Sequence, residues 1–289
     1  MSLWRTTRFA IDLSRPQVMG IVNLTPDSFS DGDPALTPAR ALARCEQLLA
    51  EGADLLDIGA ESSRPGATPV GLEVERARLL PVLAEALKLG CPISVDTTRP
   101  EVMRAALDLG ADIVNDVSAL RAPGAIEVVA AHGTCGVGLM HMRGTPQTMQ
   151  RDGGYDDVVA QVATFLRERL DAARAAGVGV DRLVVDPGIG FGKTPAHNLE
   201  LLERQRELLA LGVALLVGWS RKSTLARLIG VMTAPAERSA DERARVDAAS
   251  VATAVLAVER GARIVRVHDV RATVAALAVW QAASLRHDR

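Results

Sequence analysis

Three polar side chains stand where short apolar runs of the sequence end, and together they suit one kind of ligand. Asp96, Asn115 and Asp186 offer hydrogen-bond acceptors, and the amide of Asn115 also offers a donor. Such groups match the edge of a planar heterocycle that carries amino, ring N–H and carbonyl groups. Because these side chains are costly to bury without partners, we expect them to line a polar binding site.

A second set of such residues suits phosphate oxygens and the metal ion that accompanies them. The set comprises Asn23, Ser63, Arg266 and His268. Arg266 supplies planar paired donors, and alternation along a strand places His268 on the same side as Arg266. Lys222 stands at the start of an expected helix, where backbone N–H groups add positive potential. The two sets predict a site with a heterocycle end and a phosphate end.

Eight short runs rich in Val, Ile and Leu carry these polar residues, and longer segments with helical spacing separate the runs. Near-continuous apolar strands that alternate with helices indicate a parallel sheet covered on both faces. Eight such units in 289 residues predict an α/β fold, a closed (β/α)8 TIM barrel that forms a single domain over residues 1–289. An open doubly wound sheet is the alternative, although it normally has fewer strands. The expected strands cover residues 17–24, 53–60, 92–97, 111–118, 136–142, 182–188, 214–220 and 263–269.

The active site of such a barrel gathers at the carboxyl ends of the strands, so we expect the polar residues to meet there. The second run also carries Asp57 inside an apolar strand. Helices at 38 and 100 begin with proline, whose missing N–H costs nothing in the first turn. The expected helices cover residues 38–51, 72–89, 100–109, 123–132, 156–176, 197–211, 240–260 and 270–285.

Composition argues against several kinds of partner. Lys and Arg total 33 against 35 Asp and Glu, so the formal charge is −2 and the basic footprint of a nucleic-acid binder is missing. The 3 Trp, 1 Tyr and 4 Phe are too few for a base-stacking surface. Uncharged apolar runs stay well below the ~18 residues of a membrane span, so we expect a cytoplasmic protein with no membrane partner. Cys45, Cys91 and Cys135 are widely spaced, which predicts buried thiols rather than disulfides or a zinc site.

Three features look like other catalytic motifs and do not match them. Residues 187–194, PGIGFGKT, end like a phosphate-binding loop, but Pro187 stands where that loop needs its first glycine. Residues 218–222 lack the second glycine of a nucleophile elbow. His132 and His141 have no partner at metal-ligand spacing, and we expect His132 to end a helix.

Eight segments resemble the dihydropteroate synthase family in order and in content. The resemblance extends from residue 17 to about residue 282, and its first and sixth segments are highly specific. The segments are VMGIVNLTPDSFSDG (18–32), DIGAESSRPGA (57–67), SVDTTRPEV (94–102), IVNDVSAL (113–120), LMHMRGTP (139–146), DPGIGFGKT (186–194), SRKS (220–223) and RVHDV (266–270).

The resemblance implies an enzyme that joins p-aminobenzoate to 6-hydroxymethyl-7,8-dihydropterin diphosphate and releases 7,8-dihydropteroate and diphosphate with the help of Mg2+. The implied catalytic residues are Asp96, Asp186, Lys222, Arg266 and His268. The implied pterin ligands are Asp96, Asn115, Met140, Asp186 and Lys222. Diphosphate is assigned to Asn23, Ser63, Arg266 and His268, with Asn23 as the metal ligand. The residues implied for p-aminobenzoate are Arg64, Pro65, Phe191, Lys222 and Ser223.

Small departures from the family pattern remove no functional group. Ala60 replaces a usual glycine and therefore needs a negative φ, Ser63 replaces threonine but keeps the hydroxyl, and Trp219 is larger than the residue expected there. A pterin-binding methyltransferase that acts on methyltetrahydrofolate and a non-catalytic pterin-binding paralogue remain as alternatives. The resemblance also implies a homodimer. The Ala-rich residues 244–262 permit close helix approach, and packing of these alanines on the barrel is the alternative.

Overall fold

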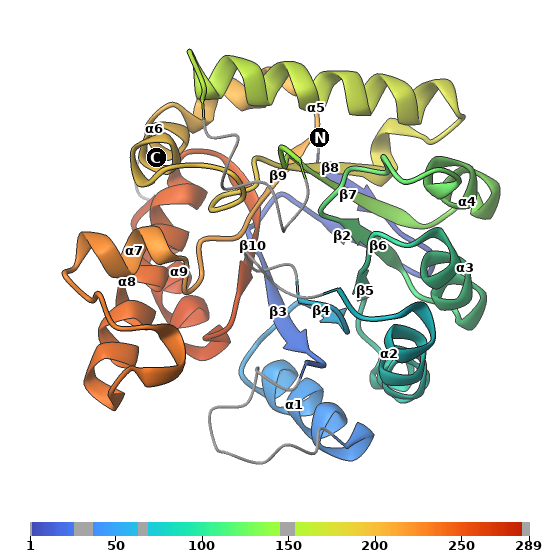
Figure 1. Cartoon of the computed structure of the whole chain (residues 1–289), viewed down its shortest axis with the longest axis horizontal. Coiled ribbons are helices and arrows are strands. Elements are labelled where there is room, and N and C mark those ends of the chain that lie inside the picture. The colour runs from blue at the N-terminus through green and yellow to red at the C-terminus, as the bar shows by residue number, and fades with distance from the viewer. Residues whose placement is uncertain (1, 26–36, 63–68, 145–153, 285–289) are drawn as a thin grey trace.

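The computed structural model describes residues 2–25, 37–62, 69–144 and 154–284. Eight parallel strands close into one barrel, in the order β10-β3-β4-β5-β6-β7-β8-β9, with helices around it (Figure 1). The predicted (β/α)8 barrel is therefore confirmed. The barrel strands are β3 (Gln17–Asn23), β4 (Leu55–Gly59), β5 (Ile93–Asp96), β6 (Ile113–Asp116), β7 (Gly136–Met140), β8 (Leu183–Asp186), β9 (Ala214–Val217) and β10 (Ala262–Val267).

The helices follow the predicted segments closely, and local capping explains several of their starts. The Thr37 side chain accepts from the backbone of Arg40, and Thr194 and Ser239 each form a capping box. The six-residue helix α7 begins directly after Lys222, where a helix start was expected, although no range was predicted for it. The helices are α1 (Pro38–Ala50), α2 (Leu72–Ala86), α3 (Pro100–Leu109), α4 (Ala125–His132), α5 (Val158–Ala175), α6 (Pro195–Glu203), α7 (Ser223–Leu228), α8 (Ala240–Glu259) and α9 (Val270–Ser284).

Smaller expectations can also be checked in the structure. His132 is the last residue of α4, and its Nδ1 accepts from the backbone N–H of Cys135 at 3.2 Å. All three cysteines are buried free thiols. Ala60 is buried and is not among the residues with positive φ. Of the helices in the described segments, none combines the length and apolar character that a membrane crossing requires.

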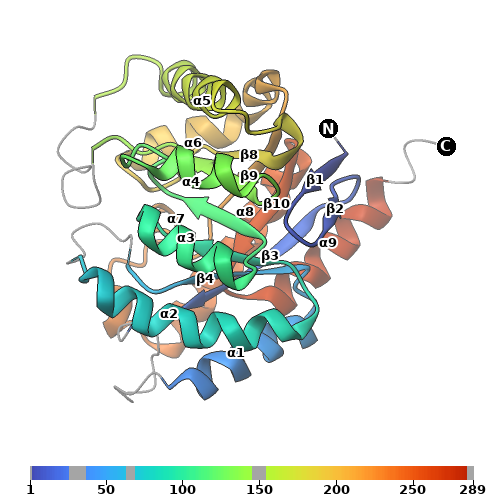
Figure 2. The ribbon, with the colours of Figure 1, turned by 90° about the vertical axis from the view of Figure 1, so that its right-hand side faces the viewer.

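A short antiparallel hairpin precedes the barrel and was not predicted. Strands β1 (Leu3–Arg5) and β2 (Ala10–Asp12) pair with Trp4 opposite Ile11 (Figure 2). Three residues per strand are too few to show a clear apolar period. Trp4, Ile11 and Leu13 nevertheless pack into one buried cluster with residues that point into the barrel, so the hairpin closes its amino-terminal end. The barrel residues of this floor are Met19, Leu55, Ile113, Val184, Ala214, Leu216 and Ile264.

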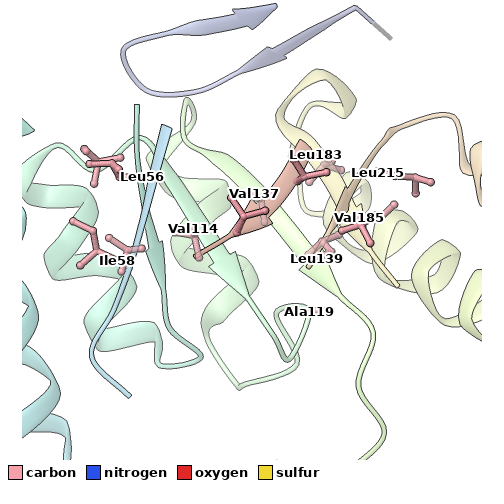
Figure 3. Packing of buried hydrophobic residues seen from close by; sticks show 14 of the residues in the cluster. Leu56, Ile58, Val114, Ala119, Val137, Leu139, Leu183, Val185 and Leu215 are labelled. Carbon is pink, nitrogen blue, oxygen red and sulfur yellow. The ribbon is translucent and has the colours of Figure 1, made fainter. Parts of the chain in front are cut away.

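Strand residues of the opposite parity point outward and pack against the helices. This outer layer is aliphatic and includes Leu56, Ile58, Val114, Leu139 and Val185 (Figure 3). Because side chains alternate along a strand, the next inward residues after the floor of β4, β6 and β8 are Asp57, Asn115 and Asp186. The interior therefore changes from an apolar floor to a polar layer within one step along these strands.

Replacement of Trp4 by alanine should destabilise the barrel. The indole is 1% exposed, and its Nε1 donates to the carbonyl oxygen of Arg182 at 2.9 Å. Its loss leaves a cavity in the floor, so we expect the free energy of unfolding to fall by about 3–5 kcal/mol in urea denaturation. The matched control is Leu3→Ala, at a neighbouring side chain that is 43% exposed, with an expected change within about 0.5 kcal/mol. Similar small changes in both variants would contradict the role of the hairpin in closing the barrel.

Candidate active site

Arg266 lies between two carboxylates at the centre of the polar layer. Its Nε donates to Oδ2 of Asp57 at 2.6 Å, and its Nη2 donates to Oδ2 of Asp96 at 2.9 Å. The strands β4, β5 and β10 bring the three side chains together at the mouth of the barrel. The arginine that was predicted for phosphate therefore contacts a residue of the predicted heterocycle end, Asp96. Its role toward diphosphate stays a prediction.

Asp57 was noted in its strand but was not predicted as a site residue. It is fully buried and also accepts from Ser94 Oγ at 2.6 Å and from Asn115 Nδ2 at 3.2 Å. The signal available in the sequence was a single carboxylate inside the otherwise apolar run Leu55–Gly59. Such a group needs partners on neighbouring strands, and only the barrel register shows which residues they are.

Two carboxyl groups of the site are held in a state that resists ionisation. Burial raises the pKa of Asp96 to about 7, because the loss of water outweighs the attraction of Arg266, and Asp57 raises it further. Burial also raises the pKa of Asp186 to about 6. The backbone N–H of Gly188 donates to Asp186 Oδ1 at 2.7 Å and lowers this pKa, but the effect of burial is larger. Both groups therefore change charge near neutral pH. This is expected of hydrogen-bond acceptors in a binding site, where a ligand supplies the donors.

An apolar wall stands beside these acceptors. Met140 forms a small buried cluster with Val117, Met142 and Phe191. The ammonium of Lys222 lies 4.1 Å from the centroid of the Phe191 ring, a cation–π contact. The predicted pterin ligand Met140 and the predicted p-aminobenzoate residues Phe191 and Lys222 thus occur in one region. Flat faces of this kind suit an aromatic or heterocyclic ring.

His268 is held by a serine that the prediction did not include. Its Nδ1 lies 2.9 Å from Ser220 Oγ, and its backbone N–H donates to the same oxygen at 3.1 Å. Arg221 next to that serine has a positive φ of 60°. Its guanidinium pairs with Asp247 of α8 at 2.7 Å, which anchors the turn that carries Ser220 and Lys222. Ser220 ends an expected strand, but only the fold shows that its partner is His268.

The loop after β8 is organised around the buried Lys193. Its ammonium donates to Gly188 O at 2.9 Å and to Phe191 O at 3.1 Å, and it lies 2.9 Å from His141 Nδ1. Burial lowers the pKa of Lys193 to about 7 and that of His141 to about 2, so the imidazole is neutral and accepts. The lysine that looks like part of a phosphate-binding loop therefore clamps its own loop.

The glycine at the start of this loop is required by a close approach. Gly188 has φ +68°, and a Cβ there would lie 1.9 Å from the carbonyl oxygen of His141. No larger residue fits without moving the backbone. The loop geometry places the Gly188 N–H on Asp186 and the Phe191 ring beside Lys222.

The remaining predicted residues differ in how far they can be placed. Asn23 ends β3 and is partly exposed, and Ser223 is exposed at the start of α7. Ser63, Arg64 and Pro65 lie outside the described residues. Within the described part of the chain, no group of three or more His, Cys, Asp and Glu side chains could hold a metal ion.

The chain is similar in sequence to known pterin enzymes. A family model described as "Pterin binding enzyme" matches residues 19–268. The dihydropteroate synthase of Neisseria meningitidis serogroup B is 51% identical over 285 residues, which cover 97% of both chains. The chain belongs to the dihydropteroate synthase family. These relatives favour the synthase over the pterin methyltransferase that the sequence left open.

Solved structures of the dihydropteroate synthase family have the same fold. The Xanthomonas albilineans dihydropteroate synthase with 4-aminobenzoic acid is 50% identical, with a TM-score of 0.86 and 95% of each chain covered. The Thermus thermophilus enzyme in complex with 6HMPPP is 44% identical, with a TM-score of 0.82, and the match covers 97% of this chain and 99% of that one. The family resemblance therefore extends to the whole barrel.

Replacement of Lys193 by methionine should destabilise the protein. The change leaves the carbonyl oxygen of Phe191 and the His141 nitrogen without their donor, and Gly188 O keeps only the N–H of Phe191, so we expect the free energy of unfolding at pH 6 to fall by about 2 kcal/mol or more. The control is Lys88→Met, because Lys88 is 68% exposed and pairs only with Glu85 among the described residues. Urea denaturation would measure both, and equal losses in the two variants would contradict the clamp.

Proposed function

We propose that the barrel mouth performs the reaction of the dihydropteroate synthase family, in which p-aminobenzoate replaces the diphosphate of 6-hydroxymethyl-7,8-dihydropterin diphosphate. The observation that carries this proposal is the layer of buried acceptors, Asp96, Asn115 and Asp186, next to the apolar wall. A pterin presents amino and ring N–H donors at its edge and a flat ring at its face. The layer supplies partners for both.

The pterin end is assigned to the acceptors together with Met140 and Lys222. Donors from the pterin would favour the ionised forms of Asp96 and Asp186, whose pKa values burial has raised. The ammonium of Lys222, which lies over the Phe191 ring, can donate to a ring carbonyl. The positive charge that develops at the pterin methylene spreads over the ring, so the negative charge of Asp186 at the ring edge would stabilise it.

Diphosphate is assigned to Asn23, Ser63, Arg266 and His268. The amide oxygen of Asn23 is a hard ligand at the open end of β3, and Mg2+ commonly takes only one or two protein oxygens beside substrate phosphates and water. The residues present therefore suit Mg2+, which would neutralise charge on the diphosphate. Ser220 holds His268 at the same mouth, where an imidazole can donate to a phosphate oxygen.

p-Aminobenzoate is assigned to Phe191, Lys222 and Ser223, together with Arg64 and Pro65. Its carboxylate suits the hydroxyl of Ser223, which begins α7, and the alkyl stem of Lys222 can line its ring. Its ring suits the face of Phe191. The clamp by Lys193 fixes Phe191 for this contact.

The reaction is a substitution at carbon. The amine nitrogen of p-aminobenzoate forms a bond to the pterin methylene, the methylene C–O bond breaks, diphosphate leaves with the electron pair, and the amine loses one proton. An arylamine is nucleophilic when neutral, so no side chain has to remove its proton first. The chain contributes orientation of the two rings and charge complementarity.

A homodimer is also proposed, from the family resemblance. In α8, Ala254 and Ala257 are buried against the barrel, whereas Ala248, Ala252 and Leu256 form an exposed stripe at helical spacing. The helix thus supports both readings of its alanines, barrel packing on one face and close approach on the other. A cytoplasmic location and one domain over residues 1–289 stay predictions.

The proposed reaction predicts a specific product. Purified protein with Mg2+, the pterin diphosphate and p-aminobenzoate should release diphosphate and form 7,8-dihydropteroate, detected by chromatography and a phosphate-release assay. The control is Asp186→Asn, which removes a carboxylate that accepts from the pterin edge and stabilises positive charge spread over the ring, and which should lower kcat by about tenfold or more. Folded protein that gives no product above background would refute the proposal.

Binding of a bare pterin should strengthen as the pH rises. Asp96 and Asp186 lose their protons near pH 7 and pH 6, and only the carboxylates accept fully from the donors of the ring. We expect the Kd of 6-hydroxymethylpterin to be about tenfold or more weaker at pH 5 than at pH 7.5 in calorimetry. In Asp186→Asn the lower of the two steps should disappear. A Kd that does not change over this range would contradict the role of the two carboxylates.

A further inference from the structure

Asp57 receives hydrogen bonds from three other strands and has no exposed surface. Its Oδ1 accepts from Ser94 of β5 at 2.6 Å, and its Oδ2 accepts from Asn115 of β6 at 3.2 Å and from Arg266 of β10 at 2.6 Å. A ligand that enters from the mouth meets these partners before it could meet Asp57. The hydrogen bonds of Asp57 therefore act on a ligand through Asn115 and Arg266.

The contact with Asp57 decides which way the Asn115 amide points. A carboxylate paired with a guanidinium only accepts, so Asn115 has to turn its nitrogen toward Asp57. The amide oxygen then lies over Gly138, where a Cβ would come within 2.8 Å of it. The absence of a side chain at Gly138 leaves room for this oxygen, and a ligand at Asn115 Oδ1 meets an acceptor.

The same carboxylate sets the position of Arg266. With Nε held by Asp57, the Nη2 of Arg266 reaches Asp96 at 2.9 Å. The guanidinium thus stays beside the acceptors and balances their charge. Two features of the pterin end, an amide oxygen turned away from Asp57 and a cation beside Asp96, depend on one buried side chain.

We propose that Asp57 is a positioning residue for ligand selectivity, which fixes Asn115 and Arg266 so that this end of the site accepts the amino and ring N–H donors of a pterin and disfavours a ring with a carbonyl in place of the amino group. The inference rests on the proposed function, because it assumes that a pterin binds among Asp96, Asn115 and Asp186.

The experiment compares 6-hydroxymethylpterin with 6-hydroxymethyllumazine, in which a carbonyl oxygen replaces the exocyclic amino group. Calorimetry gives the Kd ratio of the two ligands for the unaltered protein and for Asp57→Ala and Asp57→Asn. Asp57→Ala removes the acceptor that orients Asn115, so the preference for the pterin should fall about tenfold. In Asp57→Asn the amide oxygen can still face Asn115 and Arg266 while its nitrogen donates to Ser94, so the preference should be kept.

Asp57→Asn also provides a second readout that a purely structural role would not move. It removes a negative charge near Asp96. Of the two carboxylates that pair with Arg266, only Asp96 then remains charged. The weakening of pterin binding at low pH, which we call the acid limb, should therefore shift to lower pH by about half a unit or more. The charged groups that act on Asp96 are Asp57 of β4, Arg266 of β10, Asp116 of β6 and Glu75 of α2.

Ser94→Ala is the matched control, because it removes one hydrogen bond from the same carboxylate and leaves Asn115 its partner. It should keep the preference for the pterin. An unchanged preference in Asp57→Ala, or an equal loss in Asp57→Asn and Asp57→Ala, would overturn the inference. If Asp57→Ala does not fold, an unmoved acid limb in Asp57→Asn overturns it. No pterin binding by the unaltered protein would instead refute the proposed function, and this inference with it.

Discussion

The ion pairs of Arg266 with Asp57 and Asp96 are the interaction on which the barrel mouth depends. These charges lie directly above an aliphatic floor, where each would be costly to bury alone. Their mutual attraction offsets the cost of removing each one from water. Ser94 and Asn115 complete the hydrogen bonds of Asp57. Because the partners come from β4, β5, β6 and β10, the register that closes the barrel also assembles the site. A shift of one residue in any of these strands would turn a polar side chain toward the helices.

The site and the stability of the fold place opposite demands on the same carboxyl groups. Burial gives Asp96 and Asp186 a higher pKa in the folded chain than in the unfolded one. Such groups favour folding most when protonated, so stability is lost as the pH rises from the ordinary pKa range of a carboxyl group to about 6 to 7. The ionised forms are those that bind donors best. The aliphatic layers inside and outside the barrel wall offset this loss.

The eight strands and their polar ends were predictable because each strand of a parallel barrel is a short apolar run, and the residues that line the site follow at its carboxyl end. The hairpin of Trp4 and Ile11 was not, since its short strands have meaning only against a floor built from distant residues. The chemical type of Arg266 suggested phosphate, whereas its neighbours in space are carboxylates. The roles of Asp57, Ser220 and Lys193 were out of reach for a similar reason, because each depends on partners from other strands or loops. Residue type is visible in a sequence, and pairing between strands is not.

The amino-terminal hairpin has a consequence for the order in which the chain is made and assembled. Trp4 bonds to Arg182, Thr7 bonds to Ala111, and the floor beneath Trp4 includes Ile264 of the last strand. During synthesis this hairpin thus emerges long before Ile264, which completes its docking surface. Contacts over such long separations are slow to form. The beginning of the chain is the natural last step of assembly, and it completes a barrel whose catalytic mouth lies at the opposite end.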